Sequence, residues 1–294
     1  MAENIKFVVG VDGGGSGCRA AICTTDGSIA GAASAGPANV TSDPDRAVRN
    51  ILTAVQSAAD AAGLPFETVL SLPTHLGLAG VVTEADGQSV AGRLPFRSCQ
   101  VTDDQVTSAI GALGDRDGAL IAVGTGSFVA HKRRDALRTL GGWGLHLGDQ
   151  ASGAWLGRNA LQRCALVKDG LQQASPLSDW LLGRFDNDTG LLIAFAKTAS
   201  PADYAELAPK IFETAASDDN NAVCLVAEGA AYLNSCLDAL ALDTTEVVCL
   251  TGGLGRLYAP WIDPEYQPRL VDPLGTALDG ALCLARQIAD RAWP

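Results

Sequence analysis

The chain carries one local pattern twice: an apolar strand, a glycine-rich turn, and a second strand that leads into a polar turn. The first copy is KFVVGVDGGGSGCRAAICTTDGSIA, in which Asp26-Gly27 is a hairpin signal, and the second is GALIAVGTGSFVAHKRRDALRTLGG. A dinucleotide-binding fingerprint or a P-loop would place its glycines before a helix, and the P-loop lysine is missing here. The pattern therefore argues against both of those nucleotide folds. It predicts two related domains, each with one glycine turn.

Composition places the chain among globular proteins and argues against one class of partner. It has 294 residues, of which 47% are hydrophobic and 18% charged, so it is long enough for two domains and is not disordered. The formal net charge is −12 at pH 7. Because affinity for nucleic acid comes largely from Lys and Arg, we expect no nucleic-acid partner. The basic run Lys132-Arg133-Arg134 is interpreted as a solvated turn.

The sequence predicts a cytoplasmic protein without a membrane partner. The N-terminal residues MAENIKFVVGV contain an early acidic residue and only a short apolar run, which is not typical of a signal peptide. No stretch approaches the ~18 apolar residues of a membrane span. The eight cysteines form no C-x-x-C pair, and most lie in apolar runs, as at Cys23, Cys224, Cys249 and Cys283. We expect them to be reduced and buried.

Hydrophobic periodicity predicts alternating strands and helices after the first hairpin. We expect strands in SLPTHLGLAGV, CQVTDD and VVCLT. The expected helices cover Asp45–Ala62, which ends at Gly63, a segment from Gln105, Ser152–Val167, two or three segments within Pro201–Ala241, and Thr276–Ala292.

Five motifs in order resemble those of one superfamily. DGGGSG, VTDD, AVGTGS and LTGGLG are similar to the phosphate-1, connect-1, phosphate-2 and adenosine motifs of the sugar-kinase, actin and chaperone ATPases. The run GGWG followed by GDQASGAWLG resembles the amino-sugar kinases, in the group that also holds the BadF/BadG/BcrA/BcrD ATPases. The resemblance extends from Val8 to the final helix. No single glycine motif would be specific, but five in the family order are.

This resemblance implies an α/β fold with two ribonuclease H-like domains of the actin and hexokinase type and an interdomain cleft. The expected N-terminal domain covers residues 1–114 and the C-terminal domain covers residues 115–294, with the C-terminal helix, residues 276–292, able to join the first. The implied activity is ATP-dependent phosphorylation of an amino sugar, with glucosamine and its 6-hydroxyl as the first expectation. ATP and Mg²⁺ are the implied cofactors, and a homodimer is the family expectation.

The glycine turns would bind ATP through backbone N–H groups, helped by the hydroxyls of a serine and a threonine. The first turn comprises Gly13, Gly14, Gly15, Ser16 and Gly17, and the second comprises Gly124, Thr125 and Gly126. After the VVCLT strand, Gly252 and Gly253 would let adenine and ribose lie against the backbone. Asp12 is acidic beside a phosphate site and would hold Mg²⁺, directly or through water.

Transfer to a sugar hydroxyl needs a carboxylate that orients the hydroxyl and takes its proton. The motif VTDD offers Asp103 and Asp104. In the family the aspartate precedes a helix and stands seven residues before a small-residue pair, which Gly111-Ala112 match from Asp104. The resemblance therefore implies Asp104 as the catalytic base, in contact with the sugar, and leaves Asp103 as a solvated or helix-capping residue.

Five further residues match family positions at the sugar: Asn39, Ser127, Gly142, Trp143 and Asp149. The Trp143 face would stack on the pyranose ring, and Asp149 would accept sugar hydroxyls. Plainer interpretations are an Asx-turn for Asn39 and core packing for Trp143. After GD the chain has Gln-Ala where N-acetylglucosamine kinases have Glu-Gly, whereas GGWG favours the acetylated sugar. The substituent at C2 therefore stays open.

Three alternatives accompany glucosamine kinase. The nearest is N-acetylglucosamine kinase. The second is an ATPase activator of a 2-hydroxyacyl-CoA dehydratase, which would need cysteines for an iron–sulfur cluster between subunits, and no suitable cysteine pair is present. The third is a non-catalytic sugar sensor or repressor. No DNA-binding helix pair precedes Asp12, and such a protein would be expected to have lost Asp104, which is present.

Overall fold

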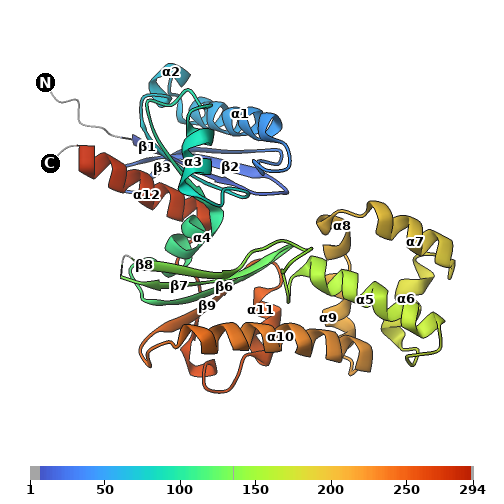
Figure 1. The fold of residues 1–294 in the computed structure, drawn as a ribbon. Coiled ribbons are helices and arrows are strands. Elements are labelled where there is room, and N and C mark those ends of the chain that lie inside the picture. Colours follow the sequence, from blue (N-terminus) through green and yellow to red (C-terminus); the bar gives the residue numbers. More distant parts are fainter. Residues whose placement is uncertain (1–6, 135, 293–294) are drawn as a thin grey trace, which may run out of the picture. The chain divides into compact units, whose positions relative to one another are not determined.

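The computed structural model describes residues 7–134 and 136–292 (Figure 1). The first six residues, on which the expectation of no signal peptide partly rests, lie outside the described part. The described residues divide into two compact units. The first contains the chain up to Arg116 together with the chain from Pro273 onward, and the second is Asp117–Asp272. The C-terminal helix α12 (Ala277–Ala292) thus belongs to the first unit.

The first unit is built on a five-stranded sheet of order β3-β2-β1-β4-β5. Strands β1 to β3 form an antiparallel meander, whereas β4 and β5 run parallel to β1. Gly27, with φ of 100°, turns the chain between β2 and β3, as the Asp-Gly signal predicts. The strands are β1 (Phe7–Gly13), β2 (Cys18–Thr24), β3 (Ile29–Ala35), β4 (Pro73–Leu78) and β5 (Ser98–Asp103).

Helices cover both faces of this sheet, because β1 alternates its buried side chains between them. Val9 and Val11 pack in the core under α1 (Pro44–Ala62), and Val8 packs against Leu282 of α12. Helix α1 begins at the Asp43 cap and ends at Gly63, whose φ is 67°, so its predicted end is confirmed. The other helices of this unit are α2 (Phe66–Val69), α3 (Glu84–Ala91) and α4 (Asp104–Leu113).

Helices α4 and α12 touch through their backbones. A Cβ at Gly111 would collide with the carbonyl oxygen of Thr276, and a Cβ at Gly280 would collide with that of Thr107. Thr107 is fully buried, and its methyl and hydroxyl lie where a side chain at Gly77 of β4 would be. Glycines on three elements therefore let α4 lie close to both α12 and β4. Figure 1 shows α4 beside one end of α12.

The second unit repeats the same strand order, β10-β9-β6-β7-β8. Again the first three strands are antiparallel and the last two run parallel to the first. The expectation of two related α/β, ribonuclease H-like units is confirmed by this shared topology. The strands are β6 (Gly118–Val123), β7 (Ser127–Arg133), β8 (Ala136–Gly141), β9 (Val247–Thr251) and β10 (Leu270–Val271).

A set of helices packs on this second sheet and forms a separate core with it. The helices expected after Gly144 and within Pro201–Ala241 are present, but α6 and α7 were not predicted, because each has at most 10 residues and little regular periodicity. The helices are α5 (Gly153–Lys168), α6 (Pro176–Gly183), α7 (Thr189–Thr198), α8 (Pro201–Ala205), α9 (Ala208–Ala215), α10 (Asn220–Leu240) and α11 (Gly255–Tyr258), with short 3₁₀ turns at Ala259–Trp261 and Gln267–Arg269.

Three expectations from the sequence need correction. Lys132 and Arg133 end strand β7 instead of forming a solvated turn, because Arg133 is held by Glu246. Cys224 is exposed, since it lies on the outer side of α10. Helix α10 is long and apolar enough to cross a membrane by length and composition, contrary to the expectation that no segment would be. Half of that stretch is buried, as in the core helix of a globular protein, so it is weak evidence of a membrane span.

Glu246 ties the end of β7 to the start of β9. Its carboxylate is 4% exposed and accepts hydrogen bonds from Arg133 Nε at 2.8 Å and Nη2 at 3.0 Å, and from the Asp243 amide at 2.7 Å. His131 Nε2 lies 3.0 Å from the same carboxylate. The bonds from Arg133, with His131 and the Asp243 amide, lower the pKa of Glu246 to about 2.

We expect Gly280→Ala to destabilise the first unit by about 2 kcal/mol. Overpacking backbone against backbone costs about 1–3 kcal/mol and outweighs the gain of about 1 kcal/mol in helix propensity. The matched control is Gly92→Ala after α3, where a Cβ would meet no atom closer than 3.5 Å and φ is −64°. Urea unfolding measures both variants. Equal stability for both would contradict the close contact of α4 and α12.

We expect Glu246→Gln to destabilise the protein by about 2 kcal/mol at pH 7, because Arg133 loses a charged acceptor. Glu228→Gln, which removes an exposed carboxylate paired with Arg163, should change stability by less than about 1 kcal/mol. The pKa of Glu246 is below its ordinary value of 4.5, so its contribution is present above that pH and is lost as pH falls toward 2. Unfolding at pH 7 and pH 3 should therefore show a smaller difference at the lower pH.

Candidate active site

The first glycine turn connects β1 to β2 and is closed by its own backbone. The Gly14 amide donates to the Gly17 carbonyl at 2.8 Å, and the carbonyl of Gly14 accepts from Ala38 at 2.9 Å. Gly13 ends β1 in a buried place where a Cβ would lie 2.6 Å from Leu78. Gly15 and Ser16 are exposed at the tip. Three of the five predicted phosphate residues, Gly13, Gly14 and Gly17, thus shape the turn, and Gly15 and Ser16 present their backbone and hydroxyl outward.

Asp12 lies just before this turn and is paired with a residue that the sequence reasoning missed. Arg19 Nη2 lies 2.5 Å from the Asp12 carboxylate, whose side chain is 12% exposed, whereas that of Arg19 is 56% exposed. The two residues face each other across the β1–β2 hairpin. The sequence could have predicted this pair. Asp12 and Arg19 lie equally far along the chain from the centre of the turn, and such residues face each other in a hairpin.

The second predicted carboxylate site lies where β5 ends and α4 begins. Asp103 is the N-cap of α4, and its side chain accepts from the Gln105 amide at 3.1 Å, so the capping interpretation is confirmed. Asp104 is the first residue of the helix. Burial, a hydrogen bond to Asp103, and the charges of Asp103 and Asp12 raise the pKa of Asp104 to about 8, against a hydrogen bond from the Gln105 amide. The first unit therefore brings Asp104 and Asp12 within electrostatic reach of each other.

Asn39 lies in the loop between β3 and α1. Its Oδ1 accepts from the amides of Thr41 at 2.9 Å and Ser42 at 3.0 Å, which is the Asx-turn that the plainer interpretation expected. This turn uses the side-chain oxygen and leaves the amide Nδ2 to donate. A sugar contact by Asn39 therefore stays a prediction and would involve Nδ2.

The second glycine turn is held by the start of α5. The Gly124 amide donates to the Gly126 carbonyl at 2.9 Å. The carbonyls of Gly124 and Thr125 accept from the amides of Gly153 at 2.8 Å and Ala154 at 3.1 Å. These two amides are the first of α5, which would otherwise lack a partner within the helix. Thr125 and Gly126 are exposed, so the tip of this turn also faces outward.

Asp149 and Ser127 join the second glycine turn to the segment that follows β8. Asp149 is 7% exposed, and its carboxylate accepts from the amides of Ser127 and Gly144. Burial raises the pKa of Asp149, and the two amides oppose that shift. The Ser127 hydroxyl donates to the Gln150 carbonyl at 2.6 Å. Both predicted sugar residues thus already make hydrogen bonds within the protein, and their contact with a sugar stays a prediction.

The segment Gly141–Ala151 has an irregular backbone with an exposed tryptophan. Gly142 has φ of 73°, and Asp149 and Ala151 have φ of 58° and 71°, a region that favours glycine. Trp143 is 70% exposed, so the core-packing interpretation of its ring is wrong. Arg158 of α5, which the sequence reasoning missed, donates to the Leu145 carbonyl at 2.9 Å and fixes the segment beside Trp143.

The third glycine turn follows β9. Gly252 has φ of 81°, and a Cβ there would collide with the carbonyl of Val123 at the end of β6, so both conformation and space require glycine. Gly253 is open to solvent on the side where a Cβ would project. A cavity of about 330 Å³ follows this turn and is lined by Leu250, Arg256, Ala259, Leu270, Val271 and Asp272.

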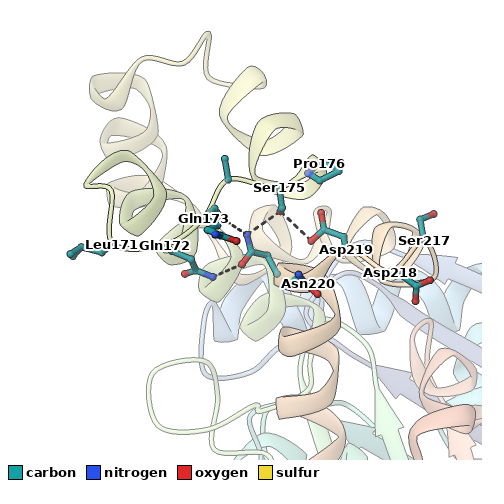
Figure 2. A pocket seen from close by; sticks show the side chains of 11 residues that line it. Leu171, Gln172, Gln173, Ser175, Pro176, Ser217, Asp218, Asp219 and Asn220 are labelled. Atoms are coloured by element: carbon teal, nitrogen blue, oxygen red, sulfur yellow. Dashed lines mark hydrogen bonds between the residues drawn. The ribbon is translucent and has the colours of Figure 1, made fainter.

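A larger cavity of about 570 Å³ lies in the second unit and includes none of the predicted site residues (Figure 2). It lies where α6 and α10 begin. The buried Asp219 caps both helices, accepting from the amides of Leu177 at 2.8 Å and Ala222 at 2.9 Å, and Asn221 bonds to Ser175 and Gln172. Because its buried polar groups bond to one another, this cluster has a structural role.

Chemically, the first unit offers a carboxylate that can accept a proton and a second carboxylate beside a glycine turn whose tip faces outward. The second unit offers another such turn, a flat exposed ring and a turn whose backbone is bare of side chains. Among the described residues no three His, Cys, Asp or Glu side chains gather as a metal site. A divalent cation here would therefore need ligands from a bound phosphate in addition to Asp12.

Comparisons with known proteins find relatives along nearly the whole chain. The chain is 33% identical to the glucosamine kinase GspK of Vibrio cholerae serotype O1 over 96% of each chain. It is similar to a solved structure from Chromobacterium violaceum, assigned as an N-acetylglucosamine kinase, with a TM-score of 0.86, 32% identity, and coverage of 96% of this chain and 100% of that chain.

A more distant structure shares the fold alone. It is the ROK family glucokinase of Streptomyces griseus with glucose and AMPPNP, at a TM-score of 0.59, 22% identity, and coverage of 96% and 99% of the two chains. The sequence also matches a family model over residues 9–267, which is most of the chain. The chain therefore belongs to the BadF/BadG/BcrA/BcrD ATPase family.

Proposed function

We propose that the protein is an ATP-dependent amino-sugar kinase that phosphorylates glucosamine, at its 6-hydroxyl. The observation that carries the proposal is the junction of β5 and α4, which holds Asp104 partly buried and near Asp12 and its glycine turn. The similarity to a glucosamine kinase along 96% of the chain supports the sugar. A cytoplasmic homodimer is proposed from the resemblance alone.

In this proposal Asp104 is the catalytic base. Its carboxylate accepts a hydrogen bond from the attacking sugar hydroxyl and then takes the proton. A bond forms between the sugar oxygen and the γ-phosphorus, and the bond from that phosphorus to the β–γ bridging oxygen breaks, so ADP leaves. Partial burial favours this role, because a desolvated carboxylate is a stronger base than one in water.

The glycine turns bind phosphate through backbone amides, with Gly15 and Ser16 at the tip of the first and Thr125 and Gly126 at the tip of the second. Mg²⁺ would neutralise phosphate charge when bound. Asp12 fits such an ion as one hard oxygen ligand, since Mg²⁺ commonly uses one or two carboxylates together with substrate phosphates. Binding would have to compete with Arg19 for this carboxylate.

The second unit supplies the sugar and nucleoside contacts in this proposal. The exposed face of Trp143 stacks on the pyranose ring, and Asp149 contacts its hydroxyls. The bare backbone at Gly252 and Gly253 accommodates the nucleoside. N-acetylglucosamine is the alternative substrate, supported by the C. violaceum structure. The left-handed Ala151 explains why a glycine suits this position in related kinases.

The test is an ADP-release assay with Mg-ATP in which glucosamine, N-acetylglucosamine and glucose are offered separately. Preference for one amino sugar over glucose supports the proposal and chooses the substrate. ADP release that ignores every sugar would contradict it.

We expect Asp104→Asn to lower kcat by ~10²-fold or more with the preferred sugar, because an amide cannot accept the proton. Asp188→Asn is the control. It removes a carboxylate from the start of another helix, the N-cap of α7, and should leave kcat unchanged. Full activity in Asp104→Asn would mean that a different group is the base.

We expect Trp143→Ala to raise KM for the sugar by roughly tenfold with little change in KM for ATP, since stacking is worth ~1 kcal/mol or more. Trp143→Phe, which keeps a flat ring, should recover most of the affinity. Leu147→Ala removes another large exposed side chain from the same segment and should have little effect. An unchanged sugar KM in Trp143→Ala would exclude stacking.

A further inference from the structure

Ala151 has a backbone conformation that its own side chain disfavours. Its φ is 71°, in the left-handed region that favours glycine, and the residue is fully buried. Gly229 of α10 leaves room for it, because a Cβ at Gly229 would lie 3.0 Å from the Ala151 Cα. A residue other than glycine keeps such a conformation only where the surrounding structure fixes it. A specific contact must therefore hold Ala151 in place.

Tyr258 of α11 supplies this contact. Its hydroxyl donates to the Ala151 carbonyl at 2.9 Å, and the whole tyrosine is buried. A Cβ at Gly229 would collide with the same hydroxyl, so one glycine makes room for both partners. The ring of Tyr258 packs edge to face with Phe212, at a centroid distance of 5.1 Å. Burial raises the pKa of Tyr258, so the hydroxyl keeps its proton and remains a donor.

Ala151 connects the segment that follows β8 to helix α5. Two residues before Ala151, the Asp149 carboxylate accepts from the Gly144 amide, which directly follows Trp143. The amide of Ser152, the N-cap of α5, donates to the Asp149 carbonyl at 3.0 Å and closes a turn around Ala151. A rotation of Ala151 out of the left-handed region would therefore move Asp149 and the backbone beside Trp143 relative to α5.

We propose that Tyr258 is a positioning residue for the sugar: its hydroxyl holds Ala151 in the left-handed conformation and so fixes the segment that contacts the sugar ring. This inference rests on the proposed function, in which Asp149 and Trp143 of that segment contact the sugar. Because Tyr258 is fully buried, it acts through the backbone of Ala151 and not by contact with the substrate.

The variant Tyr258→Phe removes the hydroxyl and keeps the ring that packs on Phe212. The buried Ala151 carbonyl then lacks its partner, and rotation of Ala151 relieves both this loss and the unfavourable φ. We expect KM for the preferred amino sugar to rise by ~10-fold. KM for ATP should change little, because the second glycine turn keeps its bonds from the amides of Gly153 and Ala154. The ADP-release assay measures both constants.

The matched control is Tyr266→Phe. Tyr266 is also buried, and its hydroxyl donates to Asp238 Oδ1 at 2.9 Å near the C-terminal end of α10. Each variant loses one tyrosine hydroxyl bond in the same unit, so both should lower the thermal unfolding temperature. Only Tyr258→Phe should raise the sugar KM. If Tyr258 served stability alone, the two variants would have the same sugar KM, and the inference would be overturned.

A double variant tests whether the hydroxyl acts through the conformation of Ala151. Glycine adopts the left-handed region without steric strain, so Ala151→Gly should make the hydroxyl dispensable. We expect Ala151→Gly combined with Tyr258→Phe to recover most of the sugar affinity that Tyr258→Phe alone loses. A double variant with the same raised KM as Tyr258→Phe would overturn the inference.

The double variant also covers the case in which Tyr258→Phe alone fails to fold, judged by its thermal unfolding curve. The double variant is then compared directly with the wild type. Folding with a sugar KM near that of the wild type supports the inference. A raised KM, or failure of the double variant to fold, overturns it, because glycine was to replace the effect of the hydroxyl.

A second measurement needs no turnover. The protein is labelled with fluorotryptophan, and the ¹⁹F signal of Trp143 is identified by its loss in Trp143→Phe. We expect this signal to move in Tyr258→Phe and to stay in place in Tyr266→Phe. An unmoved signal in Tyr258→Phe overturns the inference.

The two measurements separate this inference from the proposed function. An unchanged sugar KM in Tyr258→Phe overturns the inference and leaves the amino-sugar kinase standing. ADP release by the wild type that ignores every sugar overturns the proposed function. The ¹⁹F signal of Trp143 still decides in that case whether Tyr258 positions the segment.

Discussion

The candidate site of the first unit depends on the backbone contact between α4 and α12. Asp104 is the first residue of α4, so its position is fixed by whatever holds that helix. The two helices approach until Gly111 and Gly280 are in contact, and Thr107 fills the space left by Gly77 on β4. A helix from the far end of the chain thus sets the place of the carboxylate that we propose as the catalytic base. The small-residue pair seven positions after Asp104 has this physical reason: Gly111 is the point of closest approach.

The two glycine turns share a sequence pattern but are anchored differently. The first is held by loop amides, those of Ala38 on Gly14 and Ala79 on Gly13. The second is held by the first amides of α5, which donate to Gly124 and Thr125. Because those amides donate hydrogen bonds to the turn, the N-terminus of α5 contributes to the candidate site by holding the backbone of the turn in place. Any movement of α5 would therefore displace the tip at Thr125 and Gly126.

The sequence was sufficient for the parts of the fold that depend on local chemistry. The Asp26-Gly27 hairpin, the end of α1 at Gly63 and the cap at Asp103 each follow from side-chain and backbone preferences of a few residues. Helices α6 and α7 could not be predicted, because they are short and are fixed by contacts such as Asp219 with Leu177, which join distant segments.

The same distinction holds for the site residues: local motifs could be recognised in the sequence, whereas contacts between distant residues could not. Motifs alone indicated the glycine turns and Asp104. The motifs did not indicate that the Ser127 hydroxyl donates to the Gln150 carbonyl, or that Arg158 fixes the segment beside Trp143. Arg133 was misjudged because its partner, Glu246, is 113 residues away in the sequence. Pairing across such a separation depends on the β6–β9 contact, which no local pattern encodes.

Charge is the remaining constraint on the first unit. Asp12, Asp103 and Asp104 are close enough to affect one another, and Arg19 offsets Asp12. A polyphosphate brought to such a place would be repelled unless cations or protons came with it. In the proposed reaction a divalent ion bound with the phosphates would supply the cation, and a proton on Asp104, whose pKa is raised by burial and by the neighbouring carboxylates, would lower the negative charge. Both would reduce the same repulsion, so a site rich in carboxylates is compatible with the anionic nucleotide of the proposed reaction.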